Sequence, residues 1–277
     1  MLMKKYCCEF CFLLILLISF PAHAAGKNEI SLGLFPYVSS TQLVQFHSPL
    51  KNYLSKVLGL EVNLVTAPDF MSFVERTRQG DYDIILTAPH LGRLAEKQYK
   101  YKRLAMTGHR VEGLFLVKKD SDINTLDDLK GKTVMVAQRI SVIYQMVVQT
   151  LADKGLVDGK NISIIETKTH NNALYAPLRD EADASVTGVL LWHTLGEDYK
   201  DKLKVIAYTN SVPGFVVLSH PRISVVRQRK LKKALLDFGK TSEGKFYFEN
   251  TGLKEFLPIS DKTMRELDPY TRIFTAK

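Results

Sequence analysis

The chain has 277 residues, of which 45% are hydrophobic and 24% are charged, and this composition excludes a disordered chain, a collagen and a coiled coil. The length is enough for one large or two medium domains with a sizeable core. The formal net charge of +9 suits an anionic ligand or surface, and a merely basic, soluble surface explains it equally well.

The first 24 residues have the pattern of a secretory signal peptide. Lys4 and Lys5 precede an apolar run over 12–20, and Ala22 and Ala24 occupy the small-residue positions before a cleavage site. We therefore expect cleavage after Ala24, with an uncleaved membrane anchor as the alternative. All three cysteines lie in this segment, so the mature chain has no disulfide and no thiolate chemistry. An exported chain without disulfides fits a bacterial periplasm.

Strand and helix signals alternate from residue 30 onwards. Buried-strand runs are predicted over 30–38, 61–67, 83–88, 103–108 and 113–119, and helical periodicity over 41–58, over 69–79 and from residue 89. This order of elements, with short connections, predicts an α/β fold with a mostly parallel sheet and helices on both faces.

The same pattern begins again after residue 120. Strands are predicted over 133–138, 161–167, 182–188, 202–208 and 214–220, and helices over 140–155, 171–181 and 224–239. The chain is therefore expected to form two α/β lobes of similar build.

The carboxyl ends of the predicted strands lead into helix starts that suit an anion. Open parallel sheets bind ligands at this edge, and a helix N-terminus offers free N–H groups and the positive end of its dipole. Ser39, Thr87 and Ser141 lie at such starts, with Arg139 two residues before Ser141, and His170 and Asn171 precede a further helix at 172–180. Together they predict a site for a compact oxyanion. Each residue also has a plain structural explanation, as a helix cap, a surface cation or a loop histidine.

Catalytic and metal-binding motifs are absent from the sequence. The histidines form no HExxH pair, and there is no GxSxG elbow and no GxxxxGK[ST] phosphate loop. We expect no metal, no cofactor and no enzymatic activity. The basic run over 225–233 is interpreted as a solvated helix face, because export makes nucleic acid a poor partner.

A set of short segments occurs in an order that resembles one protein family. The segments are GLFPYVS near residue 35, VTAPDF (65–70), GDYDIILTAPH (80–90), KKDSDINTLDDLKGK (118–132), THNNAL (169–174), DEADASV (180–186) and VPGFVV (212–217). In this order they resemble the phosphate/phosphite/phosphonate-binding family of type II periplasmic solute-binding proteins of ABC transporters.

The resemblance implies a two-lobed clamshell that closes on a solute. Lobe one would comprise 25–110 plus 213–277 and lobe two 113–208, joined by hinge strands near 108–113 and 208–213. The partners would be a small anionic solute and the membrane permease of an ABC importer, and the protein would be a monomer. The alternatives are a periplasmic sensor module for a membrane kinase or cyclase, and an exported enzyme on the same scaffold.

The resemblance and the strand ends together give the expected ligand-binding residues. These are Tyr37, Ser39, Thr87, Pro89, His90, Arg139, Ser141, His170, Asn171 and Thr187.

Two departures from the family pattern concern the ligand. Phosphonate binders carry a Ser-Thr-Ser type run at the start of the lobe-two helix, where this chain has Gln138–Ser141, and the fork of Arg139 is expected to compensate. Binders of aminoalkyl phosphonates place acidic residues where Phe215, Val189 and Leu190 stand here. An amine without a carboxylate in a closed cleft is costly, so aminoethylphosphonate is not expected to be the best ligand.

Overall fold

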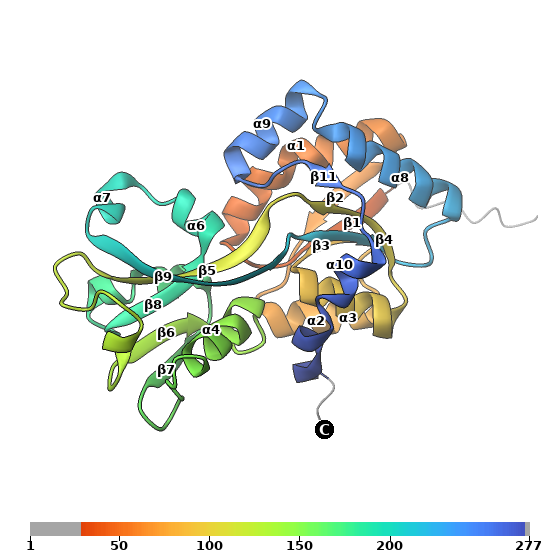
Figure 1. Cartoon of the computed structure of the whole chain (residues 1–277). Coiled ribbons are helices and arrows are strands. Elements are labelled where there is room, and N and C mark those ends of the chain that lie inside the picture. The colour runs from red at the N-terminus through yellow and green to blue at the C-terminus, as the bar shows by residue number, and fades with distance from the viewer. Residues whose placement is uncertain (1–28, 275–277) are drawn as a thin grey trace, which may run out of the picture.

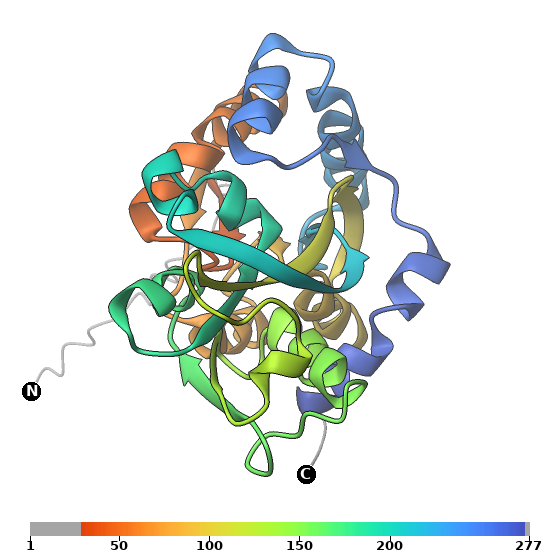
Figure 2. The ribbon, with the colours of Figure 1, turned by 60° about the vertical axis from the view of Figure 1, so that its left-hand side comes forward.

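The computed structural model describes residues 29–274 as a two-lobed α/β protein (Figures 1 and 2). The predicted signal peptide and its cleavage site lie outside the described residues. Within residues 29–274, no helix is both long enough and apolar enough to cross a membrane.

Each lobe is built on one sheet. The six-stranded sheet has the order β11-β4-β10-β3-β1-β2 and the five-stranded sheet the order β7-β6-β8-β5-β9. The strands of the first sheet are β1 (Glu29–Leu34), β2 (Glu61–Val65), β3 (Ile84–Thr87), β4 (Lys102–Thr107), β10 (Val216–Ser219) and β11 (Phe256–Leu257). Those of the second are β5 (Arg110–Lys118), β6 (Thr133–Ala137), β7 (Ser163–Thr167), β8 (Ala184–Gly188) and β9 (Leu203–Pro213).

Both sheets are mixed, so the expectation of mostly parallel sheets holds only for part of each. β1 pairs with β2 and β3 in parallel, and β6 pairs with β7 and β8 in parallel. β10 lies antiparallel between β3 and β4, and β5 lies antiparallel between β8 and β9. The antiparallel pairs follow from the connection between the lobes, because one strand leads out of the first sheet and another leads back.

The helices of the first lobe cover both faces of its sheet. Figure 1 shows α1, α8 and α9 on one side and α2 and α3 on the other. These elements are α1 (Ser40–Leu58), α2 (Phe70–Gln79), α3 (Pro89–Tyr99), α8 (Val225–Phe238) and α9 (Ser242–Thr251), followed by α10 (Asp261–Arg265) and the 3₁₀ segment η3 (Asp268–Phe274).

The second lobe has shorter helices. α4 packs on β5, β6, β8 and β9, whereas α6 contacts β5 and β8. The elements are η1 (Asp127–Leu129), α4 (Val142–Ala152), α5 (His170–Tyr175), η2 (Pro177–Arg179), α6 (Val189–His193) and α7 (Glu197–Lys200). The sequence pattern did not predict α6 or α7, because neither is long enough to show helical periodicity.

Local signals set the limits of α1 and its position on the sheet. The side chain of Ser39 caps its first turn, and Gly59 ends it in the left-handed conformation (φ 67°). Its buried residues are Leu43, His47, Leu50 and Leu54, one stripe at helical spacing. A histidine therefore occupies a position in this stripe where an apolar residue would be expected.

The chain passes between the sheets at two adjacent points, 108–109 and 214–215. Gly214 is pressed against the other crossing, since a Cβ on this residue would lie 2.4 Å from the carbonyl oxygens of Thr107 and His109. Only glycine allows this approach without displacing the backbone. The two lobes are therefore connected through a narrow, closely packed crossing.

Candidate functional site

A cavity of about 60 Å³ lies between the lobes, which is room for a solute of a few heavy atoms. Both lobes and the crossing strands line it. The lining residues are Phe35, Tyr37, Phe70, Ala88, His90, Leu91, His109, Arg110, Val111, Glu112, Ser141, Val142, Ile143, His170, Gly188, Val189, Leu190, Leu191 and Phe215.

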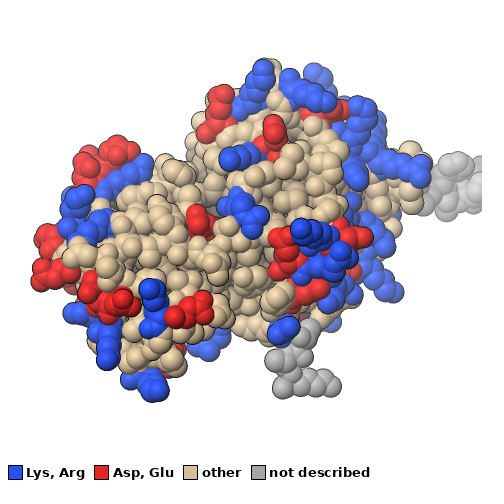
Figure 3. Space-filling model, in the orientation of Figure 1, with Lys and Arg blue, Asp and Glu red and all other residues tan. Residues whose placement is uncertain are grey.

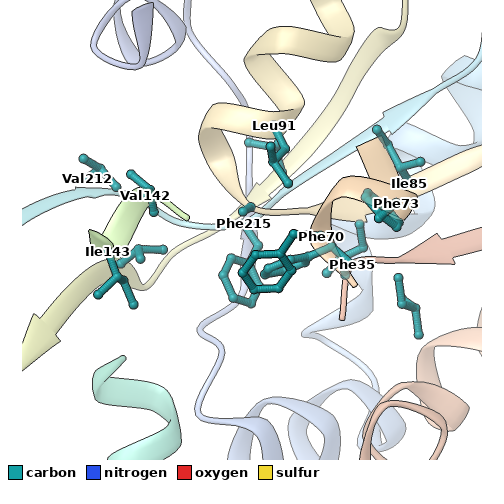
Figure 4. Close-up of a cluster of buried hydrophobic side chains, with 14 of the residues drawn as sticks. Phe35, Phe70, Phe73, Ile85, Leu91, Val142, Ile143, Val212 and Phe215 are labelled. Carbon is teal, nitrogen blue, oxygen red and sulfur yellow. The ribbon is translucent and has the colours of Figure 1, made fainter. Parts of the chain in front are cut away.

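Aromatic rings form much of the lobe-one wall. Phe35 packs against Phe215 with ring centroids 4.9 Å apart and against Phe70 at 6.0 Å. Figure 4 shows these three rings gathered together, with Val142 and Ile143 of the second lobe to one side of them. Apolar walls exclude water and so strengthen any polar contact made inside the cavity.

Helix N-termini from both lobes open into the same cavity. Ala88 and Gly188 are the N-cap residues of α3 and α6, neither helix has a side-chain cap, and both N-cap residues line the cavity. At α4 the hydroxyl of Ser141 accepts a hydrogen bond from the N–H of Tyr144. Unsatisfied N–H groups of this kind attract an anion through hydrogen bonds and through the helix dipole.

Three buried histidines line the cavity and are uncharged at neutral pH. Burial lowers the pKa of His90, of His109 and of His170 to about 4 in each case. The charge of Lys254 lowers the pKa of His109 further, whereas a hydrogen bond to Ile140 partly opposes the effect of burial on His90. The cavity therefore offers polar ring atoms without fixed positive charge.

A hydrogen bond fixes which ring nitrogen carries the proton in one of these histidines, His90. His90 Nε2 lies 2.8 Å from the carbonyl oxygen of Ile140 and must donate, because a carbonyl only accepts. His109 Nδ1 lies 2.8 Å from Thr107 Oγ1, and the Thr107 hydroxyl also lies 3.3 Å from the Phe215 carbonyl, so either His109 or Thr107 can be the donor in the shorter contact. His90 Nδ1 is therefore a buried acceptor with no partner among residues 29–274, and His109 Nε2 also has no partner there.

Four of the residues expected from the sequence line the cavity, namely Tyr37, His90, Ser141 and His170. Four others lie next to lining residues without being among them: Thr87 and Pro89 flank Ala88, Asn171 follows His170, and Thr187 precedes Gly188. The Thr187 hydroxyl donates to the backbone carbonyl of His170 at 3.4 Å. Its role in the structure is to hold the start of α5.

The structure does not bring Ser39 or Arg139 to the cavity. Ser39 caps α1 and is exposed. The guanidinium of Arg139 forms an ion pair with Glu166 at 2.8 Å, lies over the ring of Tyr144, and leaves 60% of the side chain exposed. The acidic partner on β7 explains why the cation turns away from the cleft.

Several lining residues were missed by the sequence reasoning. His109, Arg110 and Glu112 lie on the strand crossing, and Phe35 and Phe70 belong to the aromatic wall. The predicted hinge over 108–113 was the available signal, since strands that join two lobes also border the space between them. The side chain of Glu112 forms no ion pair among the described residues, and Arg110 bonds instead to Ser211.

Hydrogen bonds between residues that the structure describes join the lobes across the cleft. One runs from His90 on α3 to the carbonyl of Ile140, and another from Gln145 Nε2 on α4 to the carbonyl of Tyr270 at 3.2 Å. The lobes are therefore in direct contact around the cavity.

The surface charges do not form a single-sign field on the face in Figure 3. Lysines and arginines alternate there with acidic residues, and the middle of the face is largely uncharged. Within residues 29–274, no group of three or more histidine, cysteine or acidic side chains is placed to hold a metal ion.

Comparisons with known proteins agree with one another. The family model described as "ABC transporter, phosphonate, periplasmic substrate-binding protein" matches residues 32–264. The phosphonates-binding periplasmic protein of Escherichia coli (strain K12) is 26% identical over 261 residues, which cover 87% of this chain and 75% of the relative.

Two solved structures share the fold. PhnD1 from Prochlorococcus marinus (MIT 9301), in complex with methylphosphonate, superposes with a TM-score of 0.80 at 16% identity and covers 90% of this chain and 99% of its own. A binding protein component of an ABC phosphonate transporter from Pseudomonas aeruginosa superposes with a TM-score of 0.77 at 20% identity, covering 88% and 86%.

Proposed function

The chain belongs to the family of periplasmic phosphonate-binding proteins of ABC transporters, and we propose that its own solute is a small phosphonate held in the cavity between the lobes. Members of this family are solute-binding components of importers, not enzymes, and are periplasmic. The family match does not favour a sensor module.

The observation that supports this proposal most directly is the cavity, which opens onto the N-termini of helices from both lobes. The uncapped start of α3 lies on one side and the start of α6 on the other, with the start of α4 beside it. An anion bound there satisfies N–H groups from both lobes at once, so it favours the closed arrangement over an open one.

The size and lining of the cavity support a small solute with an apolar substituent. The volume of about 60 Å³ admits a compact headgroup, and the aromatic wall suits an alkyl group better than a second charge. Methylphosphonate, the ligand of the Prochlorococcus relative, has both features. Tyr37, His90, Ser141 and His170 are the proposed contacts.

The remaining parts of the proposal concern how the protein works in the cell. The signal peptide is cleaved after Ala24, and the mature chain acts as a monomer. Lobe one comprises 25–110 plus 213–277 and lobe two 113–208, which turn about hinge strands near 108–113 and 208–213. The closed, loaded form then docks on the membrane permease.

A thermal-shift panel on residues 25–277 tests the ligand class. The panel contains methylphosphonate, phosphite, phosphate, aminoethylphosphonate and sulfate, with amino acids as controls. Ligand at 100 times its dissociation constant adds about 2.7 kcal/mol, a shift of several degrees for a chain of this size. A selective shift with methylphosphonate supports the proposal, and no shift with any phosphonate contradicts it.

Two serine variants distinguish the cavity from helix capping. Ser141 and Ser39 both cap a helix, but only Ser141 lines the cavity. Each change to alanine is expected to lower stability by about 1 kcal/mol, through loss of the cap. Only Ser141→Ala should also weaken the binding of methylphosphonate, measured by calorimetry.

A further inference from the structure

Three side chains that are linked by hydrogen bonds connect α9 to the cavity. The hydroxyl of Tyr247 lies 3.0 Å from His47 Nδ1, and the hydroxyl of Tyr37 lies 3.1 Å from His47 Nε2. His47 and Tyr247 are almost fully buried, whereas Tyr37 lines the cavity. His47 lies on α1, Tyr247 on α9 and Tyr37 in the segment after β1. The hydrogen-bonded side chains therefore run through lobe one, from its outer helix to the cavity.

The imidazole in the middle of these three side chains is neutral. Burial lowers the pKa of His47 to about 3 and raises the pKa of both tyrosines above the ordinary value. A neutral imidazole has one N–H donor and one bare acceptor nitrogen, and each tyrosine hydroxyl has one proton to donate. Only two arrangements of these protons make both hydrogen bonds.

The two arrangements differ in which hydroxyl proton is left over. If His47 Nδ1 carries the proton, the hydroxyl of Tyr247 accepts it and its own proton has no acceptor, since this hydroxyl has no other hydrogen-bond partner among residues 29–274. If His47 Nε2 carries the proton, Tyr247 donates to Nδ1 and the spare proton belongs to Tyr37. The first arrangement leaves a buried donor unpaired on Tyr247, which is costly, and the second leaves the spare donor on Tyr37, the one of the three residues that lines the cavity.

We propose that Tyr247 and His47 are positioning residues that make Tyr37 a hydrogen-bond donor to an oxygen of the bound solute. The inference rests on the proposed function for the identity of that solute, a phosphonate. His90 lines the cavity and has only an acceptor nitrogen left, so Tyr37 supplies a donor that this ring does not provide. A residue on the outer helix of lobe one thereby determines the polarity of a contact inside the cleft.

The first test reads the tautomer of His47 directly, without any ligand. In protein labelled with ¹⁵N-histidine, the ring nitrogens of His47, assigned with a His47→Gln variant, should show protonated Nε2 and bare Nδ1. Tyr247→Phe should move the resonances towards the other tautomer, because Nδ1 loses its donor. Protonated Nδ1 in the unmodified protein would overturn the proposal.

The second test is a double-mutant cycle on the binding of methylphosphonate, measured by calorimetry. Tyr247→Phe is expected to weaken binding about three- to tenfold, because Tyr37 can then donate to His47 instead of the ligand. In a Tyr37→Phe background the same change should have no further effect. Equal weakening in both backgrounds, or none in either, contradicts the proposal.

Tyr101→Phe is the matched control for packing. Tyr101 is also a buried tyrosine of lobe one with one hydrogen bond, to the carbonyl of Tyr82 at 2.9 Å, and it does not line the cavity. This change should lower stability without altering affinity. If the protein binds no phosphonate, the proposed function fails, and the His47 tautomer alone then decides the present inference.

Discussion

At the scale of single residues, the most consequential groups are four buried histidines. His90, His109 and His170 line the cavity, and His47 lies behind it. Each keeps its ring neutral by burial, and each pKa in the folded protein lies well below the value of about 6.5 that an unfolded chain has. The unfolded state therefore binds protons more readily than the folded state in mildly acidic solution.

This difference predicts acid sensitivity of the fold. The free energy of unfolding should be constant above about pH 6.5 as far as these rings are concerned. It should fall as the pH drops from there towards 4, by up to about 1.4 kcal/mol per pH unit for each ring. Urea unfolding between pH 7 and 5 measures how steeply the free energy of unfolding falls with pH. His109→Gln should make this fall less steep, by the contribution of one histidine ring. A flat profile would show that the rings are not buried as described.

Glu112 provides a second prediction at this scale. Phe215, Val189 and Leu190 line the cavity with apolar side chains, so an ammonium group placed against these three residues would lose water without gaining a partner from them. We expect methylphosphonate to bind more tightly than aminoethylphosphonate. Calorimetry with Glu112→Gln provides the check, because Glu112 is the carboxylate lining the cavity. Submicromolar binding of the amine that disappears in this variant would identify Glu112 as its partner and refute the expectation.

Residue-level reasoning from the sequence identified four cavity-lining residues where the signal was local, and their part in ligand binding stays a prediction. Tyr37, His90, Ser141 and His170 follow directly from strand ends and helix starts. The role of His47 could not be found in this way, because its tyrosine partners are brought together only by the packing of α1 and α9.

At the scale of elements, the crossing of the two connecting strands depends on one glycine. A methyl group on Gly214 would overlap backbone carbonyls at 2.4 Å, and backbone cannot move aside as a side-chain end can. Gly214→Ala should therefore lower the free energy of unfolding by about 1–3 kcal/mol and weaken ligand binding as well. Chemical denaturation and calorimetry measure the two effects.

Gly196→Ala is the control for this change. Gly196 is the N-cap residue before α7 and has a φ of −63°, and nothing lies within 4 Å of an added Cβ. This variant should fold and bind like the unmodified protein. If Gly214→Ala behaves in the same way, the crossing is not as tight as the structure indicates.

Element boundaries were predictable where apolar periodicity was unbroken. α1, α2 and α8 begin and end within a residue or two of the expected positions. β9 was expected over 202–208 but extends over Leu203–Pro213, because its second half pairs with β5 despite polar residues such as Asn210. Pairing between distant strands is not visible in local sequence.

At the scale of the whole molecule, we expect hydrogen bonds between the lobes to set the balance between open and closed forms. Gln145 on α4 donates to the carbonyl of Tyr270 in the C-terminal segment η3, which itself lies against α3. Losing one neutral hydrogen bond costs about 1 kcal/mol, or roughly a fivefold shift in the balance. Gln145→Ala should therefore increase the radius of gyration of the ligand-free protein in small-angle scattering.

The ligand-loaded form of Gln145→Ala should keep its compact size. Gln149→Ala is the matched control on the same helix, since Gln149 bonds to Asp153 within its own lobe. An equal change in both variants would mean that α4 itself, and not the contact between lobes, had been disturbed.

The two-lobed plan followed from the resemblance. The antiparallel strands did not, because the direction of a strand depends on how the lobes are joined.

The position of β10 also has a consequence for the order in which the chain folds. β10 lies between β3 and β4, with Leu218 paired to Ile85. β3 and β4 come earlier in the sequence, so each has an unpaired edge until the last quarter of the chain has been synthesised. β6, β7 and β8 pair within one contiguous stretch and need no such partner. In pulsed hydrogen exchange during refolding, amides of β6 and β8 should become protected before those of β3. A first sheet that closes this late leaves lobe one incomplete for most of the synthesis of the chain, and an incompletely folded polypeptide is the form that can be threaded across a membrane.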